Sequence, residues 1–228
     1  MAVEGIPGNV DSPEPTSYTL PPSNFFGSLP TDITRTPASC DSDVAVAQTI
    51  RLMVDAIERD AAGPVIQKLS AGVRPWIRRD GTRVDGWFRD ESIHHWNERP
   101  QLYAFWFPKT HITFVNDESL LKVALGIPTP EEFLISPARL VTMPHPRGDC
   151  DDFTMVVCCL LRAMGLRYEI VTVAANPNYP REFSHVYARA VFDDGSRLVM
   201  DASHGDAPGW EVPADRVTRK QVWPVGCL

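Results

Sequence analysis

The residues best suited to covalent chemistry stand at positions 147–153, where Cys150 follows a glycine and is flanked by aspartates. A mainly apolar run over residues 153–164 follows, and Gly165 ends it, a pattern that predicts a buried helix over residues 151–164. A helix N-terminus and a nearby imidazolium lower a thiol pKa from about 8.5 to roughly 3.5–7.5. Cys150 is therefore the candidate nucleophile, and the same backbone N–H groups could hold an oxyanion.

The neighbouring carboxylates, Asp149, Asp151 and Asp152, admit two interpretations. All three oppose thiolate formation if they are ionised and close to the sulfur, so we expect them to cap the first-turn donors of the helix. Alternatively, with His145 they could supply oxygen ligands to a hard cation. Because they flank a helix start and do not alternate along a loop, we predict neither a metal nor a cofactor at the site.

A thiol nucleophile needs a general base, and the base needs an orienting group. His185 opens a predicted strand over residues 184–192, after a loop rich in Pro and Asn. Asp201 follows the apolar run of the next predicted strand, residues 197–202, where a buried carboxylate would require a partner. The sequence therefore predicts a catalytic triad of Cys150, His185 and Asp201.

The parity of the turn between these two strands tests the triad, because side chains alternate between the faces of a sheet. A two-residue loop at residues 194–195 would pair residue 188 with 201 and turn Asp201 away from His185. A three-residue loop at 193–195 opposes 187 to 201 and 185 to 203, which places His185 and Asp201 on one face. That loop requires Gly195 in the left-handed region, so the triad predicts a positive φ at Gly195.

Four segments together resemble the transglutaminase-like superfamily, above all small bacterial and tailed-phage members with a GDCDD-type motif. They are Gly148-Asp149-Cys150-Asp151-Asp152, Leu160-Leu161-Arg162-Ala163-Met164-Gly165-Leu166, Phe183-Ser184-His185-Val186-Tyr187 and Met200-Asp201-Ala202, with weaker likeness at Phe114-Val115-Asn116-Asp117 and Ser136-Pro137. The resemblance covers residues 43–225. It implies an α+β, papain-like core in which the nucleophile helix packs on a small antiparallel sheet, with the triad carried onto Cys150, His185 and Asp201.

The chain divides into an extended, proline-rich arm at residues 1–40 and a transglutaminase-like domain at residues 41–228. Proline fixes φ and removes a donor, so the arm is expected to hold neither a helix nor a central strand. It is either a disordered tail or a segment that docks on another subunit through apolar anchors. The domain begins with a helix over residues 43–61, with Val44, Ala47, Ile50, Val54 and Ile57 on one face and Met53 beside them, and a short helix over 65–71.

The connection to the site is less regular. An aromatic run at residues 102–107 is expected to end at Pro108, and residues 112–115 form a short strand. Residues 116–147 are an irregular connection with short helices such as 118–125, and a strand at 167–175 follows the nucleophile helix. Residues 73–101 form an Arg/Trp-rich, loop-rich insertion.

Basic and aromatic residues together, as in that insertion, can bind single-stranded nucleic acid. Five acids within the segment nearly cancel its arginines, and the whole chain carries a net charge of −7, so we predict no nucleic acid among the partners. Residues 1–20 lack the apolar core of a signal peptide and no run is long enough to span a bilayer. The expected location is a reducing cytoplasm, with incorporation into a phage particle open, and no membrane partner.

These features predict cysteine-dependent acyl transfer on an amide bond of a protein or peptide substrate. Water as acceptor makes the chain a cysteine protease or amidase, which is the expectation here, and an amine as acceptor makes it a cross-linking enzyme. The alternative is a structural or assembly protein, such as a phage particle component, that keeps the scaffold with an idle or processing-only triad.

Overall fold

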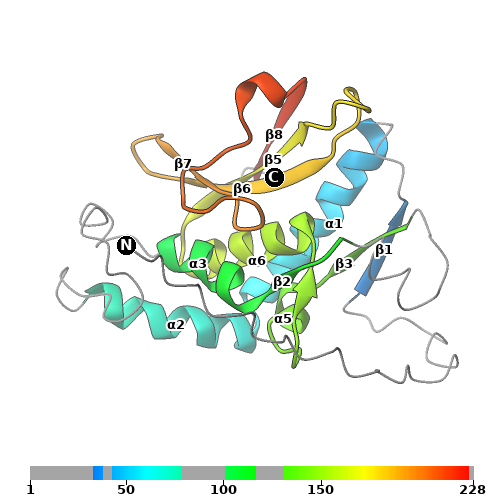
Figure 1. The fold of residues 1–228 in the computed structure, drawn as a ribbon. Helices are drawn as coiled ribbons and strands as arrows, with labels where there is room; N and C mark the ends of the chain where they lie inside the picture. Colours follow the sequence, from blue (N-terminus) through cyan, green and yellow to red (C-terminus); the bar gives the residue numbers. More distant parts are fainter. Residues whose placement is uncertain (1–32, 38–42, 79–100, 117–130, 226–228) are drawn as a thin grey trace, which may run out of the picture.

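The helix α6 (Cys150–Ala163) lies at the centre of the fold, between the sheet and the remaining helices (Figure 1). The structure is a computed structural model that describes residues 33–37, 43–78, 101–116 and 131–225. Nearly every side chain of α6 is buried, including the polar Asp151, Asp152 and Thr154. A helix that is apolar on all sides must be covered on all sides. Here α6 contacts α1 (Asp43–Ala61), α2 (Pro64–Arg78), α3 (Gln101–His111), α5 (Pro137–Leu140) and the sheet.

The sheet has four strands in the order β7-β6-β5-β8, and every neighbouring pair is antiparallel. The strands are β5 (Arg167–Ala174), β6 (His185–Val191), β7 (Arg197–Met200) and β8 (Arg219–Val225). One face of the sheet packs on α6 through residues such as Ile170 and Ala188. A second apolar cluster, which contains Val171, Val173 and Tyr187, is separate from the main core. The chain is thus α+β with a small antiparallel sheet, as predicted.

The ends of α6 follow from the residues that flank it. Asp149 is the N-cap, and its side chain accepts the N–H of Asp151 at 3.2 Å. Gly165 follows the helix with φ +80°, and the N–H of Leu166 bonds back to the carbonyl of Leu161 at 2.9 Å. Glycine tolerates this left-handed conformation and so ends the helix. The predicted helix over residues 151–164 is therefore confirmed to within one residue at each end.

The first two helices differ from the prediction in detail. The bounds of α1 agree with the expected 43–61, but its buried face centres on Val46, Ile50, Met53 and Ile57, whereas Val44 in the first turn is 77% exposed. The second helix was expected over residues 65–71 only. It extends to Arg78, so the first residues of the Arg/Trp-rich segment are helical and not a loop.

Pro108 does not end the helix that contains the aromatic run, which was expected to stop there. α3 continues through it to His111. Proline removes the one backbone donor that would bond to the carbonyl of Ala104, but the residues after it still bond back to carbonyls of the helix. The Thr110 hydroxyl lies 2.8 Å from the Trp106 oxygen, and the N–H of Ile112 bonds to the Pro108 oxygen at 2.9 Å.

Two small ladders complete the described structure. β2 (Thr113–Phe114) pairs in parallel with β4 (Arg147–Gly148), directly before the nucleophile helix. β1 (Ile33–Pro37) pairs antiparallel with β3 (Glu131–Ile135), so the end of the proline-rich arm joins a two-stranded ladder. The rest of the predicted arm, the predicted helix 118–125 and residues 79–100 of the predicted insertion lie outside the described residues. No helix of the described part is long and apolar enough to cross a membrane.

Candidate active site

Cys150 is the first residue of α6 and is partly buried. It lies two residues after the end of β4. The N–H of Val115 donates to the Gly148 oxygen at 2.9 Å, which fixes the segment two residues before the thiol. Gly148 is needed there because a Cβ at this position would stand 2.4 Å from Oδ2 of Asp152. The turn in front of Cys150 is therefore held from both sides. The thiol consequently sits at the positive end of the helix dipole.

The three aspartates of this segment have three different roles. Asp149 caps the helix, as predicted for all three. Asp152 instead accepts the backbone N–H of Ile135 through Oδ1 at 2.9 Å and so ties the helix start to β3. Asp151 is buried, and its Oδ1 has no hydrogen-bond partner in the described structure.

Burial raises the pKa of Asp151 well above its usual value, and the acidic neighbours Asp149, Asp152 and Cys150 raise it further. A carboxyl group with a raised pKa keeps its proton to higher pH. The negative charge beside the thiol is thus smaller than three ionised carboxylates would give. The electrostatic objection to a reactive Cys150 is correspondingly weaker.

The hairpin that presents the histidine has the predicted register. Ala188 pairs with Met200, and Val191 pairs with Arg197. The same register places Phe192 opposite Ser196, where the Phe192 N–H donates to the Ser196 oxygen. Residues 193–195 form the three-residue loop, and Gly195 has φ +80°. β7 is shorter than expected and ends at Met200, so Asp201 follows directly after the strand.

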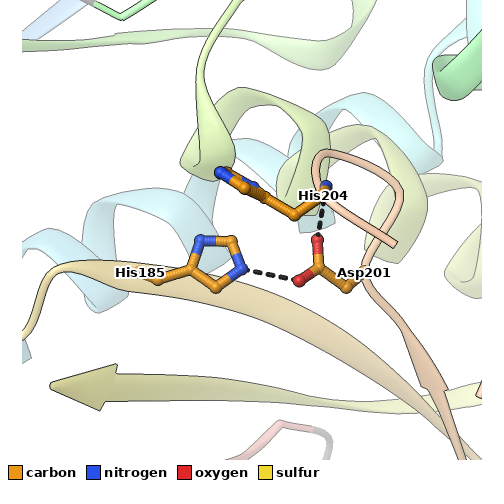
Figure 2. A group of neighbouring side chains, drawn as sticks. All are labelled: His185, Asp201 and His204. Carbon is orange, nitrogen blue, oxygen red and sulfur yellow. Dashed lines mark hydrogen bonds and ion pairs between the residues drawn. The ribbon is translucent and has the colours of Figure 1, made fainter. Parts of the chain in front are cut away.

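His185 and Asp201 meet as this register requires. Nε2 of His185 lies 2.6 Å from Oδ2 of Asp201, and both side chains are largely buried, at 8% and 0% exposure (Figure 2). Burial alone would raise the pKa of Asp201, but the bonds from His185, the His204 N–H and the Ser203 hydroxyl outweigh it and lower that pKa. The carboxylate is therefore held ionised against the imidazole, and Nδ1 is the ring nitrogen left to face another group.

Cys150 and His185 line the same pocket, which encloses about 620 Å³ including the part open to solvent. Asp149 and Asp151 also line it, next to Cys150 in the chain, and α1 supplies further lining residues. The other lining residues are Ala45, Val46, Thr49, Ile50, Met53, Thr172, Phe183, Ser184 and Val186. The pocket thus joins the candidate nucleophile and base, and Asp201 lies behind the histidine.

His204 is a member of this site that the sequence did not indicate. Its ring packs edge-on against His185 with centroids 4.5 Å apart, and its backbone N–H donates to Oδ1 of Asp201 at 3.0 Å (Figure 2). Burial lowers the pKa of His204, and the neighbouring His185 lowers it further. The spacing Asp-x-x-His, in which the aspartate closes a tight turn, is the signal that could have found it.

Two further cysteines of α6 stand apart from this arrangement. Cys158 and Cys159 are fully buried within α6, and burial raises the pKa of both thiols, so they are suited to packing and not to nucleophilic chemistry. In the described residues the oxygen atoms of Asp149, Asp151 and Asp152 approach within 4.8 Å, a spacing that could hold a cation. His145 is exposed and not part of that group.

No protein-family model matches the chain, and no curated protein does either. Among solved structures, the chain is similar to Rad4-Rad23 bound to a 6-4 photoproduct UV lesion and to Rad4-Rad23 crosslinked to an undamaged DNA. Each match has a TM-score of 0.43 and 11% identity, and covers 72% of this chain. The chain spans 38% of the length of each of these structures.

These neighbours correct the prediction that nucleic acid is not a partner, since one is bound to a 6-4 photoproduct UV lesion and the other is crosslinked to an undamaged DNA. The prediction rested on the charge balance within the Arg/Trp-rich segment and on the net charge of the whole chain, neither of which describes one surface of the folded chain. The exclusion is withdrawn. A likeness of this degree does not assign DNA binding to this chain.

Proposed function

We propose that this chain is a cysteine-dependent acyl-transfer enzyme of the transglutaminase-like superfamily, with a papain-like core in residues 41–228. The observation that carries the proposal is the His185–Asp201 pair at 2.6 Å on the pocket that Cys150 also lines. A thiol at a helix start, a histidine at a strand start and an aspartate after the next strand make up a nucleophile, a base and an orienting group.

In this mechanism Sγ of Cys150 attacks the carbonyl carbon of an amide while Nδ1 of His185 takes the thiol proton. The imidazolium is stabilised by Asp201, which stays ionised. The tetrahedral intermediate expels the amine, which takes the proton back from His185, and a thioester remains on Cys150. Water, deprotonated by the same histidine, then releases the acid and restores the thiol. In this proposal, backbone N–H groups at the start of α6 bind the oxyanion.

The first test measures the rate at which iodoacetamide alkylates Cys150 at pH 7, read by mass spectrometry of the peptide that contains it. We expect the folded chain to react at least tenfold faster than the denatured chain, because the helix start and His185 favour the thiolate. Cys158 and Cys159 are internal controls, since both are buried and should stay unmodified. A rate no higher than that of the denatured chain contradicts the proposal.

The second test asks whether Cys150 reacts fast because His185 activates it or only because the thiol is accessible. His185→Gln removes the base, whereas His111→Gln alters a histidine of α3 outside the described pocket. We expect the first change to lower the alkylation rate at least tenfold and the second to leave it within twofold. Profiling of the same variants against peptide amides, with and without an added amine, then distinguishes hydrolysis from transamidation.

A further inference from the structure

The side chains of His185, Asp201 and His204 form a compact cluster (Figure 2), and of these three only His185 is among the residues that line the pocket. Each offers one ligand atom, and these atoms lie within 4.8 Å of one another. We propose that the cluster is a binding site for a Zn²⁺-like transition-metal ion, and that the bound ion inhibits Cys150 chemistry by occupying the base.

In Asp201 and His204 the second polar atom is already engaged, which leaves one atom of each residue for the ion. Oδ1 of Asp201 accepts the Ser203 hydroxyl at 2.8 Å and the His204 N–H at 3.0 Å, so Oδ2 remains for the metal. Nδ1 of His204 lies 2.9 Å from the same hydroxyl, so Nε2 remains. Such outer partners fix ligand orientation in metal sites.

Two imidazoles and a carboxylate suit Zn²⁺, which takes nitrogen and oxygen ligands at about 2.0–2.2 Å in a tetrahedron. Tetrahedral angles at those lengths separate ligand atoms by about 3.3 Å. His185 Nε2 and Asp201 Oδ2, now 2.6 Å apart, would therefore move apart slightly, and the His204 ligand atom, which lies within 4.8 Å of both, would adjust to the same separation. His204 stands on an exposed turn and can make that adjustment, and the same exposure gives the ion a route from solvent.

The binding claim is independent of the proposed enzyme activity, but the inhibition claim rests on it. A metal bound at Nε2 of His185 replaces the proton that the ring shares with Asp201. The imidazole is then fixed to a cation, which disfavours the second positive charge that general-base catalysis requires at Nδ1. Cys150 would lose its proton acceptor while its place at the helix start is unchanged.

The test uses the full chain after treatment with a chelator. Titration calorimetry with ZnCl2 measures the affinity, and the visible absorption of added Co²⁺ reports the tetrahedral geometry. We expect one ion per chain, with at least tenfold weaker binding in His204→Ala and in Asp201→Asn. His145→Ala is the matched control, because this histidine is exposed and outside the cluster, and it should bind as the unchanged chain does.

Three outcomes overturn the site: no stoichiometric binding, equal binding in His204→Ala, or loss of binding in Asp149→Asn with the cluster intact. The last would place the ion at the acidic group before α6. Alkylation of Cys150 by iodoacetamide is measured on the same samples with and without Zn²⁺. A slow rate in the metal-free chain contradicts the proposed function alone, whereas a fast rate that saturating Zn²⁺ leaves unchanged contradicts the inhibition.

Discussion

The Thr154 hydroxyl of α6 lies 3.1 Å from the carbonyl oxygen of Val186, the residue that follows His185 on β6. It also lies 2.7 Å from the carbonyl oxygen of Cys150, one helical turn back. The same buried hydroxyl therefore links the helix that carries the candidate nucleophile to the strand that carries the candidate base. Thr154 contacts neither reacting atom, so we regard it as a positioning residue.

Thr154→Val keeps the shape of the side chain and removes the hydroxyl. The Val186 and Cys150 carbonyls then lose a buried donor, which costs about 1–3 kcal/mol of unfolding free energy. We expect a several-fold slower alkylation of Cys150 in chains that remain folded, because the helix start and β6 are no longer joined. Urea unfolding and iodoacetamide kinetics measure the two effects. Thr154→Ser is the control and should retain most of both properties.

Gly148→Ala tests the close approach in front of the thiol. An added Cβ would stand 2.4 Å from Oδ2 and 2.6 Å from Cβ of Asp152, which is fully buried and bonded to Ile135. Because the Asp152 side chain is buried and bonded, it cannot move away from the added methyl group. We therefore expect overpacking to lower the free energy of unfolding by about 1–3 kcal/mol. Gly63→Ala is a milder comparison, since its nearest contact would be 3.1 Å. Equal urea midpoints for the two variants would contradict this account.

Much of the site could be predicted because its residues obey local rules. The glycine after α6 and the alternation of side chains on β6 and β7 determine the helix end and the hairpin parity, and the parity alone places Asp201 beside His185. The contribution of Thr154 could not be predicted, and that of His204 only from the spacing Asp-x-x-His at a tight turn. Both contributions depend on which groups of another segment lie within hydrogen-bond distance in the folded chain. The periodicity of apolar residues in the sequence does not indicate those distances.

The errors have equally specific causes. Pro108 was expected to end the aromatic helix because proline lacks a donor, but it removes a single backbone bond and the helix continues to His111. Val44 was assigned to the buried face of α1. It lies in the first turn, at the edge of the core, where a residue with the right helical spacing can still be exposed because no other element packs over it. Tertiary position overrides local pattern in both cases.

Gly195 tests the dependence of the site on the hairpin turn. Its φ is +80° and a Cβ there would meet nothing within 4 Å, so any penalty comes from the backbone alone. Gly195→Val should cost roughly 1–2 kcal/mol, because a branched residue avoids the left-handed region. Gly195→Asn should cost less, since asparagine tolerates it. We expect slower Cys150 alkylation in the valine variant only. Equal alkylation rates in the two variants would show that the site does not depend on the conformation of this turn.

Glu211 provides a pH-dependent test away from the candidate chemistry. Its carboxylate accepts the Tyr187 hydroxyl, Nη2 of Arg189 at 3.1 Å and Nζ of Lys220 at 2.5 Å. Burial by itself would raise its pKa, but the bonds from Lys220, Tyr187 and Arg189 lower that pKa from 4.5 to about 2. The segment that follows β7 is thereby fastened to β6 and β8.

A carboxyl group whose pKa is lower in the folded chain binds its proton more weakly there than in the unfolded chain. Its stabilisation is therefore complete above pH 4.5 and is lost as the pH falls towards about 2. Glu211→Gln should cost about 1–2 kcal/mol at pH 7, a modest value because the group is partly exposed. The difference from the unchanged chain should shrink between pH 4.5 and 2, as measured by urea unfolding. Asp206→Asn, at an exposed position of the same segment, is the control. If the difference in unfolding free energy between Glu211→Gln and the unchanged chain stays constant over this pH range, the carboxylate charge does not hold the segment.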